Sequence, residues 1–285
     1  MGLIAVIGGT GKVGRHVVAG LRGAPVRVLS RTDQGASTQN GRQDVEFVRA
    51  DLDDPSTLNS ALEGVDRLFI ATPYHPQQGE RECAAIKAAE AVGIKHVVKI
   101  SSYSAGIEPE VPISRGHKMA ERALRASSMS WSFLRPDWWF DNMLLQLQSI
   151  RDGKFFFPAH GAQVTAIDAR DLADVAIAEL RAVRPYGGVL SLTGPETLGL
   201  DAIAARLSVA IGRPLSFVDD VSPVWPPIYA QAVEKLFVHY RERGSAPFTH
   251  TVSELLGRAP RSIDQFGKEV LAPLLSAEQL ASFKA

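Results

Sequence analysis

The feature that most constrains this chain is its first fourteen residues. Residues 3–7 form a short apolar run that suits one buried strand of a parallel sheet. A glycine-rich turn follows at 8–14, and apolar side chains then recur at helical spacing up to Leu21. A strand, a glycine turn and a helix in this order are typical of a dinucleotide-binding unit.

The glycines have separate expected roles in such a turn. Gly8 suits the tight turn, Gly11 allows a pyrophosphate to approach the backbone, and Gly14 allows the helix to pack close to the strand. The free N–H groups at the start of the helix favour a phosphate. A tight turn without a ligand is the alternative. A nucleotide-triphosphate loop is excluded, because Val13 follows the lysine and Val6 replaces the leading glycine of that motif.

The cofactor preference is predicted from the end of the second strand, at residues 26–30. Arg31 follows this strand, and neither Asp nor Glu occurs between Val26 and Thr32. An acidic residue at this position bonds the ribose 2′-hydroxyl, whereas an arginine suits a 2′-phosphate. A charge-assisted hydrogen bond contributes about 1.5–3 kcal/mol. With Lys12 nearby, we expect NADP(H) to be preferred over NAD(H); a solvated surface arginine is the alternative.

Strands alternate with helices along the first two thirds of the chain. Further strands are expected at 45–48, 67–71, 96–101, 131–136 and 189–193. Helices are expected at 78–92 and 115–124, and residues 166–173 are expected to open another. This order predicts an α/β fold, a Rossmann-type doubly wound parallel sheet. Three capping-box patterns, at 251–254, 262–265 and 276–279, indicate a mainly helical tail.

We expect two domains. Residues 1–136, with 160–194 returning to the sheet, form an NADP-binding Rossmann domain; residues 137–159 and 195–285 form a smaller substrate-binding domain. Ligands bind at the carboxyl ends of parallel strands. The residues there are Asp51 and Leu52, Thr72, Pro73 and Tyr74, and Ser101 and Tyr103, which follow the third, fourth and fifth strands.

The chain lacks the pair that short-chain dehydrogenases use for proton transfer. No tyrosine is followed four residues later by a lysine. His117 and Glu121 stand at this spacing instead and share one helix face. His117 is a candidate to hydrogen-bond substrate or ribose, or to donate a proton near neutral pH. The alternative is a partly exposed histidine with a structural role.

Aromatic residues gather after the sixth strand. Trp138, Trp139 and Phe140, together with 155–157, form either plain core or the floor of a pocket for a flat aromatic substrate. No metal site is expected, because the seven histidines are scattered. Asp168 and Asp171 are interpreted as helix caps.

The composition limits the classes of binding partner and the cellular compartment that we expect. The formal net charge is zero, so nothing favours direct contact with nucleic acid or an anionic membrane. The single cysteine, Cys83, excludes an intrachain disulfide, is expected to be a small buried residue, and fits a reducing cytoplasm. No apolar run reaches the length of a membrane span. We expect a monomer or a homodimer.

The ordered set of motifs resembles the NmrA-like family of atypical short-chain dehydrogenases. The likeness covers nearly the whole chain and is carried by 8–14, 101–103, 117–121, 133–136 with Asn142, 168–171 and 255–260. That family includes NADPH-dependent quinone reductases, triphenylmethane dye reductases and isoflavone-type reductases. It also includes redox sensors that bind the dinucleotide without turning it over. Isoflavone-type reductases carry a working lysine where this chain has His117, so the quinone and dye reductases are the nearer subgroup.

The resemblance implies a site and a function. Expected cofactor contacts are Gly8, Thr10, Gly11, Lys12, Val13, Arg31, Asp51, Leu52, Thr72, Pro73, Tyr74, Ser101 and Pro136; His117 is the catalytic candidate, and Tyr103, Trp138, Trp139 and Asn142 would contact substrate. The expected activity is NADPH-dependent hydride transfer to a quinone-like or conjugated aromatic molecule. The alternative is a non-catalytic NADP(H) sensor that acts through a protein partner.

Overall fold

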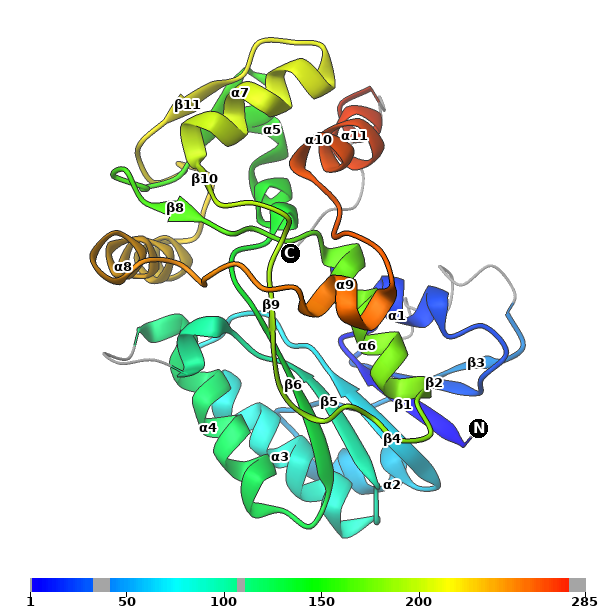
Figure 1. Cartoon of the computed structure of the whole chain (residues 1–285). Helices are drawn as coiled ribbons and strands as arrows, with labels where there is room; N and C mark the ends of the chain where they lie inside the picture. The colour runs from blue at the N-terminus through cyan, green and yellow to red at the C-terminus, as the bar shows by residue number, and fades with distance from the viewer. Residues whose placement is uncertain (1, 33–41, 107–110, 277–285) are drawn as a thin grey trace. The chain divides into compact units, whose positions relative to one another are not determined.

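The computed structural model describes residues 2–32, 42–106 and 111–276 of the chain (Figure 1). The chain divides into two compact units. The first unit comprises Met1–Arg135 and Leu172–Ser191, and the second comprises Pro136–Asp171 and Leu192–Ala285. The assignment of cofactor and substrate to separate domains, with the boundaries expected from the sequence, stays a prediction.

The first unit is built on a seven-stranded sheet. Its strands are β1 (Leu3–Ile7), β2 (Val26–Ser30), β3 (Val45–Arg49), β4 (Val65–Ile70), β5 (His96–Ile100), β6 (Ser130–Pro136) and β9 (Gly188–Leu192). They lie in the order β3-β2-β1-β4-β5-β6-β9, and the pairs from β3 to β6 are parallel. The strand order reverses between β1 and β4, which is where such sheets bind ligands. The predicted Rossmann-type α/β fold is confirmed.

Helices cover both faces of this sheet (Figure 1). The first unit contains α1 (Gly14–Gly20), η2 (Pro55–Thr57), α2 (Leu58–Leu62), α3 (Gln78–Ala91), η3 (Tyr103–Gly106), α4 (Pro112–Ala126) and most of α6 (Ala169–Arg181). Apolar side chains of α2, α3 and α4 form one buried core with the sheet. On the other side α1 and α6 approach closely, because a Cβ at Gly20 would lie 2.3 Å from the Ile177 side chain.

The second unit contains short strands and many helices. Its strand pairs are β7 (Lys154–Phe156) with β11 (Ser216–Val218), and β8 (Gln163–Val164) with β10 (Leu198–Gly199). Its helices are η4 (Phe140–Gln146), α5 (Leu147–Arg151), α7 (Leu200–Ile211), α8 (Pro227–Arg243), α9 (Thr251–Leu256), α10 (Ile263–Phe266), the π-helical turn η5 (Gly267–Leu271) and α11 (Ala272–Ser276). The tail is mainly helical, as predicted.

The capping boxes of the tail have three different outcomes. The box of Ser262 and Gln265 is confirmed, because each side chain bonds the backbone N–H of the other residue. The box at Thr251 is wrong: α9 begins at Thr251 itself, and His250 precedes it without a side-chain cap. The end of the third pattern, 276–279, lies outside the described residues. None of the described helices is long and apolar enough to span a membrane.

Candidate functional site

The glycine turn after β1 is tight for a geometric reason. Gly8 has a φ of +82°, and a Cβ there would lie 1.8 Å from the Ala71 carbonyl oxygen. A Cβ on Gly14 would lie 2.0 Å from the carbonyl oxygen of Gly8. On Gly11 it would meet only that same oxygen, at 3.2 Å, and otherwise open space. The predicted tight turn and close helix packing are confirmed, and Gly11 leaves the backbone accessible. Thr10 is exposed, Lys12 half-buried and Val13 buried.

Charged groups lie where β2 and β3 end. Arg31 is exposed, and Asp51 accepts a hydrogen bond from the backbone N–H of Asp53 at 3.0 Å. Arg81 of α3 donates two hydrogen bonds to the Asp53 carboxylate, both at 2.6 Å. The pKa of Asp53 is lowered by Arg81 first and by His75 and Arg31 to a smaller extent. Arg81 therefore neutralises the charge of the Asp53 carboxylate, while the side chain of Arg31 stays exposed.

The segment after β4 leads into a buried polar network. Thr72 donates a hydrogen bond from its hydroxyl to Oε1 of Glu82, at 2.6 Å. Glu82 lies on α3 and is fully buried. Pro73 is exposed and Tyr74 half-buried. Of this predicted group, the Thr72 side chain is thus already bonded within the protein, while Pro73 and Tyr74 keep exposed surface.

Lys99 of β5 is the central residue of that network. Its side chain is fully buried, and Nζ lies 2.8 Å from Oε2 of Glu82. Nζ also donates to the carbonyl of Ile100 at 2.8 Å and lies 3.1 Å from Nδ1 of His117. The sequence interpretation did not single out Lys99. The available signal was a lysine within the apolar run 97–100 of a buried strand, since a lysine is almost never fully buried unless it is paired.

His117 is half-buried on α4, and two side chains meet its Nδ1. Besides Lys99, the amide nitrogen of Gln78 lies 3.4 Å from this atom. Burial, and then the charge of Lys99, hold the pKa of His117 well below its ordinary value. The imidazole is therefore neutral at physiological pH. Of the two roles expected for His117, hydrogen bonding to a ligand fits this state better than proton donation by an imidazolium.

Glu121 has partners other than His117. Its Oε1 accepts hydrogen bonds from the hydroxyl of Ser101 at 2.6 Å and from Nε of Arg135 at 2.8 Å. A second Arg135 nitrogen binds Oε2, so the pair is bidentate. His117 and Glu121 therefore share a helix face at one-turn spacing without a hydrogen bond between them among the described residues. Ser101 is 2% exposed, and its hydroxyl is bonded within the first unit.

Most of the substrate candidates belong to the second unit. Trp138 is 3% exposed and packs edge-on against Phe157, with ring centroids 4.8 Å apart. It therefore belongs to an aromatic core. Trp139 and Asn142 are half-buried, and Pro136 is buried. Tyr103, in the first unit, is half-buried at the start of η3. A ligand role for these residues stays a prediction.

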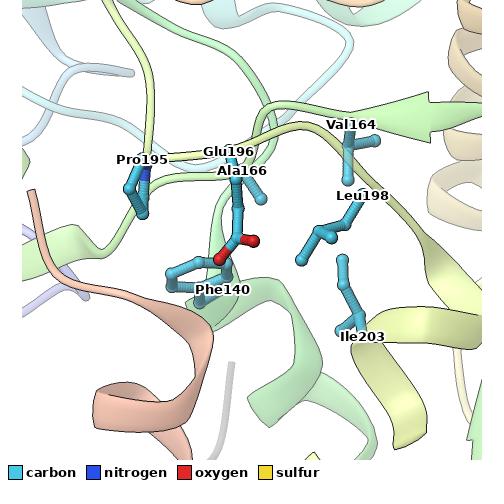
Figure 2. A pocket seen from close by; sticks show the side chains of 7 residues that line it. All are labelled: Phe140, Val164, Ala166, Pro195, Glu196, Leu198 and Ile203. Carbon is cyan, nitrogen blue, oxygen red and sulfur yellow. The ribbon is translucent and has the colours of Figure 1, made fainter. Parts of the chain in front are cut away.

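A shallow hollow lies in the second unit (Figure 2). Its lining residues are Phe140, Val164, Ala166, Pro195, Glu196, Leu198 and Ile203. The carboxylate of Glu196 forms an ion pair with Arg206 at 2.6 Å. The hollow has no room for an enclosed water molecule, so we interpret it as a packing gap.

The acidic residues around α6 are structural. Asp168 accepts the backbone N–H of Arg170 at 2.8 Å, as a cap does. Asp171 instead binds the side chains of Arg258 and Arg261, so its interpretation as a cap is wrong. Among the residues that the structure describes, no three His, Cys, Asp or Glu side chains form a group that could hold a metal ion.

Comparison with known proteins identifies the family. Residues 8–182 match the sequence profile of a family described as NAD(P)H-binding. The chain belongs to this NAD(P)H-binding family. It is 34% identical over 93% of its length to the NAD(P)H azoreductase of Xenophilus azovorans, of which the alignment covers 97%. The curated relatives, among them a quinone oxidoreductase of Escherichia coli that is 26% identical over 75% of this chain, place the chain among the NAD(P)H-dependent oxidoreductases.

Two proteins of known structure share the fold over nearly the whole chain. The quinone oxidoreductase QOR2 of Escherichia coli, solved with NADPH, has a TM-score of 0.82 at 23% identity, covering 95% of this chain and 99% of its own. NmrA, a negative transcriptional regulator solved with NADP, has a TM-score of 0.77 at 21% identity, covering 96% of each chain. The resemblance to the NmrA-like family is confirmed.

Proposed function

We propose that this protein is an NADPH-dependent reductase that delivers a hydride to a quinone-like or other conjugated aromatic small molecule. The observation that carries the proposal is the neutral His117 ring, which is held by Lys99 near the carboxyl ends of β4 and β5. The names of the relatives support it, because azo compounds and quinones are both conjugated acceptors of reducing equivalents.

The glycine turn fits a dinucleotide. The backbone at Gly11 is open, whereas Gly8 and Gly14 leave no room for a side chain in the turn itself. We propose that the pyrophosphate lies on this turn, that Arg31 binds a 2′-phosphate, and that Asp51 with Leu52 borders the adenine. Because Arg81 matches the charge of Asp53, a phosphate beside Arg31 would meet little repulsion from that carboxylate.

The chemistry requires little from the protein beyond position and electrostatics. The bound dinucleotide would supply the hydride. A quinone that gains a hydride and one proton from water becomes a hydroquinone, so electrons and protons balance without an enzymic acid. His117, as a neutral N–H donor, would stabilise the negative charge that develops on the substrate oxygen. This assignment explains how a chain without the tyrosine–lysine pair can still be catalytic.

The deciding experiment follows NADPH oxidation by the purified protein against quinones, azo dyes and enones. We expect turnover with at least one quinone or azo compound. Tight NADPH binding without oxidation on the whole panel would contradict the reductase and favour the alternative, a redox sensor that acts through a protein partner. The missing tyrosine–lysine pair motivates that alternative.

The cofactor preference has its own test. Arg31→Asp is expected to lower the preference for NADPH over NADH by roughly tenfold to a hundredfold, the equivalent of one charge-assisted hydrogen bond. Arg22→Asp is the matched control, because Arg22 is also exposed and lies between α1 and β2. The measurement is the ratio of the two dissociation constants. An unchanged ratio in Arg31→Asp would remove Arg31 from the site.

The glycine turn is tested by two alanine variants with opposite expectations. Gly11→Ala should fold normally and bind NADPH about tenfold more weakly, since its Cβ would enter the space assigned to the phosphates. Gly14→Ala should lower the melting temperature, because its Cβ would collide with the backbone of Gly8. Calorimetry of NADPH binding and thermal unfolding separate the two effects. Unweakened binding by Gly11→Ala would place the phosphates elsewhere.

A further inference from the structure

We propose that Lys99 and Glu82 are a buried positioning pair that fixes the tautomer of His117 and leaves its Nε2–H as a permanent hydrogen-bond donor to substrate. The inference deepens the proposed function and rests on it for the identity of the ligand. It assigns a role to two charged residues that the hydride-transfer chemistry does not itself use.

The tautomer follows from counting donors. A lysine ammonium has three N–H donors and no acceptor. Nζ of Lys99 donates to the Ile100 carbonyl at 2.8 Å and lies 3.1 Å from Nδ1 of His117, while its contact with Oε2 of Glu82, at 2.8 Å, is an ion pair. Nδ1 must therefore accept, and a neutral imidazole whose Nδ1 accepts carries its proton on Nε2. The amide nitrogen of Gln78, 3.4 Å from Nδ1, is a second donor on the same side.

Glu82 is needed to keep the charge on Lys99. Both side chains are fully buried, and an isolated ammonium in such a place is strongly unfavourable. The carboxylate is itself held through Oε1, which accepts from Thr72 at 2.6 Å and from Gln78 at 3.3 Å. The ammonium that dictates the His117 tautomer is thus fixed by α3 and by the end of β4.

The opposite edge of the imidazole remains for a ligand. Within the described residues, both hydrogen bonds of His117 involve Nδ1, and its side chain is half-buried. The carboxylate of Glu121, one turn further along the same helix, is bound by Arg135 and Ser101 and forms no hydrogen bond with His117 among the described residues. A carbonyl oxygen, which accepts hydrogen bonds, is the chemical group that suits an Nε2–H.

A purely structural role predicts something different. A buried ion pair is often no more stabilising than apolar residues of the same size, so stability alone does not explain why Lys99 also contacts His117. If the pair served only packing, removing it would change the melting temperature and leave the state of the imidazole unaltered. The tautomer is therefore the informative readout.

The test is ¹⁵N NMR of histidine-labelled full-length protein without substrate. We expect His117 to show only the Nε2–H tautomer between about pH 6 and 8. Lys99→Met should give a mixture of tautomers and raise the midpoint of the His117 titration, because the charge of Lys99 is removed, while burial still holds it below the ordinary histidine value. The double variant Lys99→Met with Glu82→Gln, which leaves no unpaired buried charge, should do the same if the single variant folds poorly. Lys95→Met, which breaks the exposed pair with Asp66, is the matched control.

Kinetics and NMR together separate the possible failures. With an active substrate, Lys99→Met should lower kcat by about tenfold or more and change the NADPH dissociation constant little. An Nδ1–H tautomer in the wild-type protein, or an unchanged tautomer in both Lys99 variants, would overturn the inference. An inactive protein that still shows the fixed Nε2–H tautomer would overturn the proposed function and leave the positioning pair established.

Discussion

His96, the first residue of β5, and His117, which contacts Lys99 of the same strand, differ in their hydrogen bonding. His96 is 3% exposed, and both ring nitrogens are bonded: Nδ1 to Ser130 at 2.8 Å and Nε2 to Ser132 at 3.0 Å. Ser132 in turn donates to Glu179 at 2.6 Å. His117 has bonds at one nitrogen only among the described residues. The imidazole of His96, bonded at both nitrogens, serves the structure of the sheet. The imidazole of His117, bonded at Nδ1, keeps Nε2 for a hydrogen bond to a ligand.

The largest expected effect is on catalysis. His117→Asn keeps an acceptor for Lys99 and removes the Nε2–H, so kcat/KM should fall by about a hundredfold, as when one oxyanion donor is lost. His117→Gln, whose amide can replace the Nε2–H, should recover part of this loss. His96→Leu should leave kcat/KM near the wild-type value. Equal losses in His96→Leu and His117→Asn would erase the distinction between the two rings.

The second expected effect is on stability, where the substitution of His96 should have the larger effect and that of His117 the smaller. His96→Leu removes two buried hydrogen bonds and should lower the free energy of unfolding by about 1–3 kcal/mol. His117→Asn should lower it by less, because Lys99 keeps a partner. Urea unfolding at neutral pH measures both. A larger loss in His117→Asn would show that His117 is the structural residue.

The third effect is a dependence of stability on pH. Burial lowers the pKa of His96 to about 4, while Glu179 opposes this shift and Arg67 adds to it. A histidine in the unfolded chain has a pKa of about 6.5, so between these two values the unfolded chain binds one more proton than the folded protein. Acidification through this range should therefore cost up to about 1.4 kcal/mol per pH unit. Urea unfolding at several pH values should show a shallower slope for His96→Leu; an equal slope would mean that His96 is protonated in the fold.

The glycine turn and the sheet were predictable because their signals are local. Gly8, Gly11 and Gly14 act through spacing along one short segment, and β1 and β2 have the bounds expected from their apolar runs. The strands β7, β8, β10 and β11 have two or three residues each, too few to produce a periodic pattern. The second unit was therefore recognised only as mainly helical.

The polar network was not predictable in the same way. His117 and Glu121 share a helix face, but their partners come from β5 and β6, where Lys99 pairs with Phe133 and Arg135 lies two residues beyond. Spacing along one helix cannot reveal which strand residue lies opposite. The sequence thus indicated His117 as a candidate site residue. Its contact with the buried Lys99 became apparent only from the tertiary structure.

The reactivity of Cys83, the single cysteine of the chain, matters if the substrates are the quinones proposed above. Quinones are electrophiles that arylate cysteines, and the thiolate is the species that attacks. Cys83 is half-buried rather than buried as expected, and burial, followed by the charges of Glu82 and Glu80, raises its pKa. The carboxylate that serves Lys99 on one side thus also suppresses ionisation of the neighbouring sulfur. Under the proposed function, this arrangement would keep the thiol of Cys83 protonated in the presence of electrophilic substrates.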